Sequence, residues 1–178
     1  MTFIFPGEAS LLLWLQNCLR GGFLDSVMTA ITHLGDGGVF WIVMTLLLLC
    51  IPKTRRTGLA CAVSMVIGLI VTNLVLKNLI ARVRPYELIE GLTILVKTPH
   101  DWSFPSGHTT NAFAAGWVMF AMLPKKYGVP ALILAILIAF SRMYVGVHYP
   151  TDILGGVIVG CFAAWCARGI VKKYIPQR

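Results

Sequence analysis

Charged residues are scarce in this sequence, and acidic residues are the scarcest of them. Only 12% of the 178 residues are charged, with 7 acidic residues against 15 lysines and arginines, whereas 57% are hydrophobic. Soluble globular domains carry about 25% charged residues, so this composition excludes that class. The mean hydropathy of +0.79 agrees with this conclusion. The sequence therefore predicts an integral membrane protein.

Several other features are also missing. No internal repeat, low-complexity segment or linker is visible, and no basic segment precedes the first apolar residues as in a secretory signal peptide. The cysteines lack the spacing of metal ligands, so we expect them to be small apolar packing residues; they are Cys18, Cys50, Cys61, Cys161 and Cys166. We expect a single domain over residues 1–178. Within it, residues 1–36 are predicted to form an N-terminal interfacial segment and residues 37–178 a helix bundle that carries the function.

Apolar stretches that approach the length needed to cross a bilayer, about 20 residues, recur along the chain. They cover 39–52, 59–76, 106–123, 129–147 and 153–171. The first is short and is expected to start earlier, because Asp36 and its neighbouring glycines interrupt the apolar pattern rather than end it. Residues 7–34 mix leucines with polar residues, which favours interfacial amphipathic helices, with a sixth span as the alternative. The predicted fold is all-α: a polytopic membrane helix bundle of about five to six transmembrane helices with N-terminal interfacial amphipathic helices.

Basic residues outside the apolar stretches predict the orientation. Three groups follow the first, third and fifth spans and should share the cytoplasmic side; they are Lys53, Arg55 and Arg56, then Lys125 and Lys126, then Arg168, Lys172, Lys173 and Arg178. The net charge of +8 is mostly this bias, so it does not call for a nucleic-acid partner. Four basic residues fall on the opposite side, where they are disfavoured: Arg82, Arg84, Lys97 and Arg142. We expect a function to account for them.

The first candidate cluster on that side is "KNLIARVRP". Lys77 and Arg84 are seven residues apart, which returns a helix to nearly the same face, and Pro85 ends any preceding helix. Arg82 should point elsewhere. The alternative for the pair is that both side chains extend toward the lipid headgroups.

The second cluster is "FPSGHTTNAF". Pro105 suits the start of a helix, and Ser106 and Gly107 leave backbone N–H groups open, which makes the helix N-terminus an anion site. His108 in the first turn can point at the bound group. The alternative is that Ser106 is merely a helix cap and His108 a hydrogen-bonded interfacial histidine.

The third cluster, "SRMYVGVHYPTD", ends the fourth span and starts the fifth. Arg142 precedes His148, Pro150 is expected to start a helix, and Asp152 lies in its first turn. Whether His148 joins the helix or precedes it, Asp152 can accept a hydrogen bond from its ring and fix which nitrogen is free. The alternative is a purely structural His–Asp pair.

The topology brings all three clusters to one membrane face. Together they supply three cations, a helix N-terminus and two histidines, which suits a phosphoryl group because its transfer is catalysed mainly by positioning and charge stabilisation. The sequence therefore predicts a phosphate site with a histidine nucleophile. No carboxylate-rich cluster calls for a metal.

The three clusters, in this order, resemble the signature of the type-2 phosphatidic acid phosphatase superfamily. The resemblance implies that His148 is the nucleophile, that Asp152 orients it and that His108 is the general acid. It also implies that the phosphoryl oxygens are held by Lys77, Arg84, Ser106, Gly107 and Arg142. Arg82 and Lys97 either attract an anionic headgroup or are solvated, and we favour solvation. The segment His33–Asp36 also resembles bacterial members, but we assign it no catalytic role.

The resemblance further implies a metal-independent membrane lipid phosphatase without a cofactor, in the cytoplasmic membrane of a bacterium, with the site on the extracytoplasmic side. Its substrate is expected to be a lipid phosphate or diphosphate, with undecaprenyl diphosphate favoured over phosphatidylglycerol phosphate and phosphatidic acid. Two alternatives remain, a lipid phosphotransferase that uses the same site and a lipid transporter or scramblase. Transport has no need of two histidines and an aspartate, so the enzyme is favoured.

Overall fold

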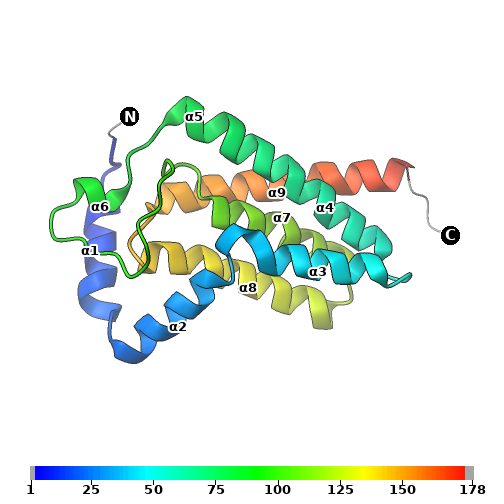
Figure 1. Ribbon diagram of the computed structural model, residues 1–178, viewed down its shortest axis with the longest axis horizontal. Coiled ribbons are helices and arrows are strands. Elements are labelled where there is room, and N and C mark those ends of the chain that lie inside the picture. The colour runs from blue at the N-terminus through cyan, green and yellow to red at the C-terminus, as the bar shows by residue number, and fades with distance from the viewer. Residues whose placement is uncertain (1–2, 175–178) are drawn as a thin grey trace.

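The computed structural model describes residues 3–174, and five helices form its body (Figure 1). They lie side by side along the long axis of the molecule: α3 (Val39–Cys50), α4 (Arg55–Leu69), α7 (Gly107–Met122), α8 (Lys125–Tyr144) and α9 (Pro150–Tyr174). Residues 3–174 contain no strand, which confirms the predicted all-α fold. Arg178, the last residue of the predicted cytoplasmic groups, lies outside the described residues.

Shorter helices cover one end of this bundle. After α4 the helix widens into a π-helical segment, Ile70–Leu76, and continues as α5 (Lys77–Ile80). Pro85 starts α6 (Pro85–Leu88), where its missing N–H costs nothing. At the N-terminus, α1 (Glu8–Leu19) crosses the end of the bundle, and α2 (Gly22–His33) leads from it toward α3 (Figure 1).

Three helical stretches within residues 3–174 are long and apolar enough to cross a bilayer: Arg55–Leu88, α8 and α9. α2 and Asp36–Cys50 reach that length only when they are counted together, and they meet at a bend of 45°. The central helix α7 has 16 residues and packs against α4, α8 and α9. The interruption seen in the sequence at Asp36 is this bend. The boundary at residue 36 between an interfacial segment and the helix bundle stays a prediction. α2 lies on the N-terminal side of this boundary and packs against α8 of the bundle.

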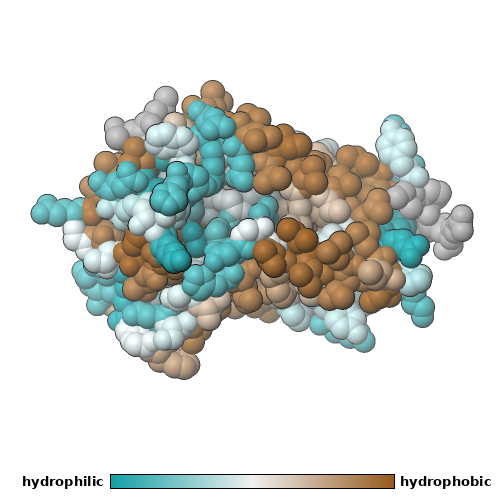
Figure 2. All heavy atoms as spheres, viewed as in Figure 1, coloured by the Kyte–Doolittle hydropathy of each residue, from teal (hydrophilic) through white to brown (hydrophobic). Residues whose placement is uncertain are grey.

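Small residues let the central helices approach one another. A Cβ atom at Gly160 of α9 would lie only 2.7 Å from the carbonyl oxygen of Thr110 in α7, and one at Gly156 only 2.8 Å from that of Ser106. Such contacts suit membrane helices, which associate by close packing because lipid supplies no hydrophobic drive between them. Large apolar side chains point outward instead, among them Ile42, Leu46, Val66, Ile133, Ile158 and Phe162. Figure 2 shows the result, a mainly hydrophobic band between two hydrophilic ends.

The two ends differ in what they carry. The connections that follow α3 and α7, with the basic groups at 53–56 and 125–126, lie at the same end as the C-terminal part of α9 (Figure 1). The opposite end holds α5, α6, the loop 89–106, the start of α7 and the turn between α8 and α9. All three sequence clusters therefore meet at the end that α1 crosses.

Candidate active site

A cavity of about 190 Å³ lies at this end of the bundle, where the clusters meet. Six of the predicted site residues line it: Lys77, Arg84, Gly107, His108, Arg142 and His148. The other two, Ser106 and Asp152, are buried behind its wall. Asn73, Asp101 and Asn111 also line the cavity, and the sequence patterns did not predict them. The volume is that of a few water molecules, each about 30 Å³ in the liquid, so it fits a phosphate group but not a lipid tail.

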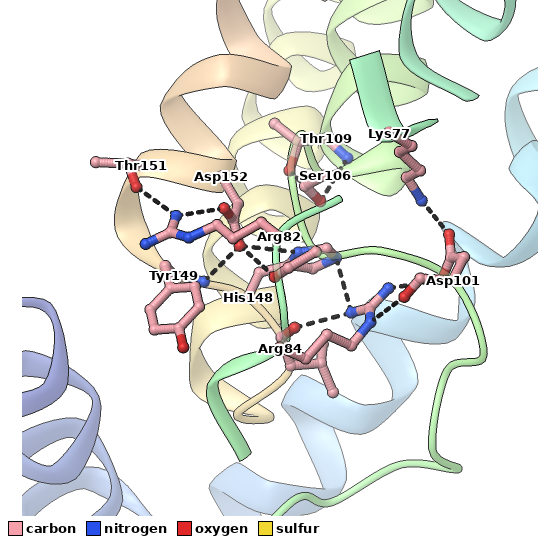
Figure 3. Close-up of polar contacts among 12 residues, drawn as sticks. Lys77, Arg82, Arg84, Asp101, Ser106, Thr109, His148, Tyr149, Thr151 and Asp152 are labelled. Atoms are coloured by element: carbon pink, nitrogen blue, oxygen red, sulfur yellow. Dashed lines mark hydrogen bonds and ion pairs between the residues drawn. The ribbon is translucent and has the colours of Figure 1, made fainter. Parts of the chain in front are cut away.

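His148 lies in the turn before α9 and is almost completely buried. Its Nδ1 atom is 3.4 Å from Oδ2 of Asp152, and its Nε2 atom is 3.4 Å from the guanidinium of Arg84, which lines the cavity (Figure 3). Burial, and then the positive charges of Arg84 and Arg142, lower the pKa of His148 well below 6.5. A guanidinium can only donate, so a neutral ring with its proton on Nδ1 turns its Nε2 lone pair toward Arg84. This is the form that can act as a nucleophile once the lone pair is directed at phosphorus instead.

Asp152 lies in the first turn of α9 and is held on both carboxylate oxygens. Arg82 donates to Oδ1 at 2.6 Å and the Tyr149 backbone N–H donates to Oδ2 at 2.9 Å (Figure 3). The Ser103 hydroxyl also donates to Oδ2, at 2.5 Å. Asp152 has no solvent exposure. Its orientation toward His148 is therefore fixed by the surrounding protein.

Three cations border the cavity and are nearly inaccessible to solvent: Lys77, Arg84 and Arg142, with exposures of 6%, 3% and 4%. Arg142 donates from Nη1 to the Thr32 hydroxyl at 2.7 Å, and its buried Nε finds no hydrogen-bond partner in the described part of the chain. An anion in the cavity is the natural partner for such a donor. Side chains that extended to the headgroups would be exposed, so burial disfavours that alternative for Lys77 and Arg84.

Asp101 occupies part of this cationic surface. Its carboxylate pairs with Lys77 and accepts a hydrogen bond of 2.6 Å from Arg84, and its backbone oxygen accepts another from Arg84 at 2.8 Å. Partial burial favours the neutral acid, but the two cations outweigh it and lower the pKa of Asp101 to about 2. Asp101 is thus an anion held where a phosphate oxygen would also bind.

The start of α7 forms another part of the wall. The Ser106 hydroxyl accepts from the Thr109 N–H at 3.5 Å and is 3.1 Å from the Thr109 hydroxyl, so it serves as the helix cap that the sequence allowed as an alternative. A Cβ at Gly107 would lie 3.8 Å from Nζ of Lys77. Without one, the backbone there is open toward that cation.

His108 has a carboxylate partner to which the sequence assigned no role. Its Nε2 atom is 2.8 Å from Oδ1 of Asp36, whose Oδ2 is 2.7 Å from Nδ1 of His33. Gly35 permits this contact, because a Cβ there would lie 2.6 Å from the ring of His108. The glycine and aspartate of "THLGD" were the available signal in the sequence.

The expectation that Arg82 is solvated is wrong. Arg82 is completely buried, with its guanidinium between Oε2 of Glu8 at 2.5 Å and Oδ1 of Asp152 at 2.6 Å, and 3.9 Å from the ring centre of Tyr149. The sequence placed this arginine outside the spans but could not show that α1 folds over it. Lys97, in contrast, is exposed as expected.

Within residues 3–174, no group of three or more His, Cys, Asp or Glu side chains is arranged to hold a metal ion. The residues around the cavity are instead cations, histidines and amides. A multi-pass helical bundle with such a site defines the protein as a membrane phosphatase.

The family comparison agrees with this class. The model of the PAP2 superfamily, whose signature the three clusters resemble, matches residues 57–176, and the chain belongs to this superfamily. The "Undecaprenyl-diphosphatase" of Sulfolobus acidocaldarius is 32% identical over 155 residues, which is 84% of this chain and 74% of that one. "Decaprenylphosphoryl-5-phosphoribose phosphatase" of Mycobacterium tuberculosis is 31% identical over 86% of this chain and 85% of its own.

A solved structure also shares this arrangement of helices. The crystal structure of a transmembrane PAP2-type phosphatidylglycerolphosphate phosphatase from Bacillus subtilis has a TM-score of 0.78 and 30% identity, covering 97% of this chain and 88% of that one. The bundle described above is therefore a PAP2 membrane phosphatase fold.

Proposed function

We propose that this protein removes phosphate from a lipid phosphate or diphosphate through a phosphohistidine intermediate on His148. The observation that carries the proposal is a small cavity that is bordered by Nε2 of His148, by three buried cations and by His108. A phosphoryl group in that cavity meets a nucleophile and charge stabilisation together. Burial and Arg142 lower the pKa of His108 to about 4, and the negative charge of a bound phosphate raises it again, which favours the protonated ring that can donate.

The first step breaks the bond between phosphorus and the leaving oxygen. Nε2 of His148 attacks phosphorus, and Asp152 stabilises the positive charge that develops on the ring by accepting from Nδ1–H. The cations and the start of α7 hold the phosphoryl oxygens, and His108 gives a proton to the leaving oxygen as the bond electrons move to it. Water then attacks phosphorus and gives a proton to His108, the bond between phosphorus and Nε2 breaks, and inorganic phosphate and neutral His148 are released.

A second hollow supports a lipid leaving group. It has a volume of about 980 Å³, shares Pro99, His108 and Arg142 with the phosphate cavity, and is also lined by the apolar side chains Ile94, Leu95 and Val96. A lipid headgroup there would keep its tail toward the bilayer while its phosphate entered the smaller cavity. Since relatives named for polyprenyl substrates align over most of the chain, undecaprenyl diphosphate is the favoured substrate.

The distribution of basic residues supports a location for the active site on one side of the membrane. The groups at 53–56 and 125–126 lie at the end opposite the cavity, and basic loops favour the cytoplasm. We therefore place the active site at the extracytoplasmic face of the cytoplasmic membrane of a bacterium.

Phosphate release by the purified protein in detergent tests the proposal. Undecaprenyl diphosphate, phosphatidylglycerol phosphate, phosphatidic acid and a water-soluble phosphoester are compared in the presence of excess chelator. His148→Ala should lower kcat at least about 10³-fold, the scale seen when a nucleophile is lost, while His100→Ala, at an exposed histidine, should match wild type. Near-normal release by the His148 variant would refute the mechanism, and the order of the substrates would identify the lipid class.

A further inference from the structure

One acidic residue of α1 reaches the active site from outside the part of the chain that the family model covers. Glu8 is the first residue of this otherwise amphipathic helix and lies well before the matched residues 57–176. It is nevertheless only 5% exposed. A carboxylate is rarely buried without a specific partner, so its contacts indicate what it does.

Both oxygens of Glu8 contact residues that border Asp152. Oε2 accepts a hydrogen bond of 2.5 Å from Nη2 of Arg82, whose Nη1 donates to Asp152. Oε1 accepts from the hydroxyl and the backbone N–H of Thr151, at 2.5 and 3.1 Å. Thr151 directly precedes Asp152 and also receives a hydrogen bond from Arg82 at 2.7 Å. Glu8 thus ties α1 to the first turn of α9 at the residue next to Asp152.

Charge balance gives this contact a chemical meaning. Arg82 is one buried cation between two buried carboxylates, Glu8 and Asp152. With Glu8 present, the arginine shares its charge between both partners, and the cluster keeps a net negative charge beside the histidine. With Glu8 neutral, the same cluster has no net charge, so Asp152 would offer less stabilisation to a positive ring on His148.

We propose that Glu8 is a positioning residue of the active site. Through Arg82 and Thr151 it fixes the orientation of Asp152 and keeps the electrostatic potential around Asp152 negative, and both effects support His148. This inference rests on the proposed function of His148 as the nucleophile. It makes α1 a component of the active site rather than only a membrane-surface helix.

The inference predicts an effect on the pH profile. The charged and titratable groups around His148 are Lys77 of α5, Arg84 beside α6, His108 of α7, Arg142 of α8 and Asp152 of α9. Apart from Asp152 they favour the neutral ring, so removal of a negative charge behind Asp152 makes protonation of His148 still less favourable. The acid limb of kcat/KM should therefore move to lower pH in Glu8→Gln.

Three variants test the inference. In Glu8→Gln, kcat should fall about 10-fold, the low end for loss of an outer-shell partner, with KM within about 2-fold of wild type. Glu8→Asp keeps the charge, so its acid limb should stay in place while kcat falls by a smaller factor. Leu12→Ala is the matched control: Leu12 is buried in α1 and packs in the same apolar cluster as Tyr149, so its truncation leaves a cavity and loosens the helix but removes none of the hydrogen bonds that Glu8 makes.

The outcomes separate a positioning role from a structural one. Leu12→Ala should lower Tm but leave both kcat and the acid limb unchanged. The inference fails if Glu8→Gln has the wild-type kcat and pH profile, or if Leu12→Ala reproduces its changes. If Glu8→Gln does not fold, an unchanged kcat in Glu8→Asp overturns it instead. The wild-type and His148→Ala activities test the proposed function separately, because Glu8 is unchanged in both proteins.

Discussion

The two histidines at the cavity each have a carboxylate partner, but the two pairs lie in different surroundings. Asp152, beside His148, has no solvent exposure and is held by Arg82, Ser103 and the backbone. The side chain of Asp36, beside His108, is 53% exposed, and its other contact is an exposed histidine. One half of the site is thus enclosed in protein and the other half is open to solvent.

The difference matches the proposed chemistry. A nucleophile needs a fixed direction of attack and a neutral ring, and both are favoured by burial among fixed dipoles and charges. A general acid must regain its proton in each turnover, and an opening to water allows that exchange. The comparison predicts that the buried pair is far less tolerant of change than the open one.

Asp152→Asn should have the largest effect. The amide keeps the shape of the side chain but cannot stabilise a positive ring or enforce the same tautomer of His148, so kcat should fall about 10³- to 10⁴-fold, as for the corresponding change in a serine protease triad. The measurement is kcat for lipid phosphate hydrolysis, with the purified variant shown to be folded by its Tm.

Ser103→Ala serves as the comparison for this variant, because it removes one hydrogen bond to Asp152 and leaves the charge. Its loss in kcat should be much smaller. If Asp152→Asn lost less than about 10-fold, the carboxylate would not have the orienting role that the aspartate of a catalytic triad has toward its histidine.

Asp36→Asn should have an intermediate effect that depends on the leaving group. General acid catalysis raises the rate about 10²- to 10⁴-fold. A misaligned acid should lose only part of this gain, so kcat on a lipid alkyl phosphate should fall about 10-fold. On p-nitrophenyl phosphate, whose leaving group needs little protonation, the loss should be under about 2-fold. Comparison of kcat for the two substrates measures this, and equal losses on both would exclude a role through His108. His33→Asn, which alters only the far side of Asp36, is the matched control and should cost less.

Much of this architecture could be predicted from the sequence, because lipid imposes a simple pattern on it. Apolar stretches located the helices of the bundle, and proline marked the starts of α6 and α9. The spacing of His148 and Asp152 placed the two side chains together. These features depend on residues close in the chain, where helix geometry decides which side chains meet.

The missed features depend on contacts between distant segments. Glu8 is 74 residues from Arg82 and Asp36 is 72 from His108, and no periodicity links such pairs. Arg82 was misjudged for the same reason, since it is buried by residues 3–8 and by the start of α9, which are distant in the sequence. Asp101 lies in the loop 89–106, which has no regular structure that would fix its direction. Its contact with Lys77 and Arg84 therefore required the folded structure.

Asp101→Asn should have the smallest effect. Unlike the other variants it should improve a property of the site, the binding of phosphate. Asp101 joins the two cations at the boundary between the buried and open halves, and its side chain is 54% exposed, so an incoming phosphate competes with a partly solvated ion pair. Such pairs are worth about 0.2–1 kcal/mol, so removal of the Asp101 charge should lower the concentration of inorganic phosphate needed for half-inhibition by roughly 1.5- to 5-fold.

Glu90→Gln is the control, because it removes the same charge from an exposed residue of this loop and should leave inhibition unchanged. Weaker inhibition of Asp101→Asn would instead show that Asp101 holds Lys77 and Arg84 in place for the phosphate, which would make it part of the binding surface rather than a competitor for it.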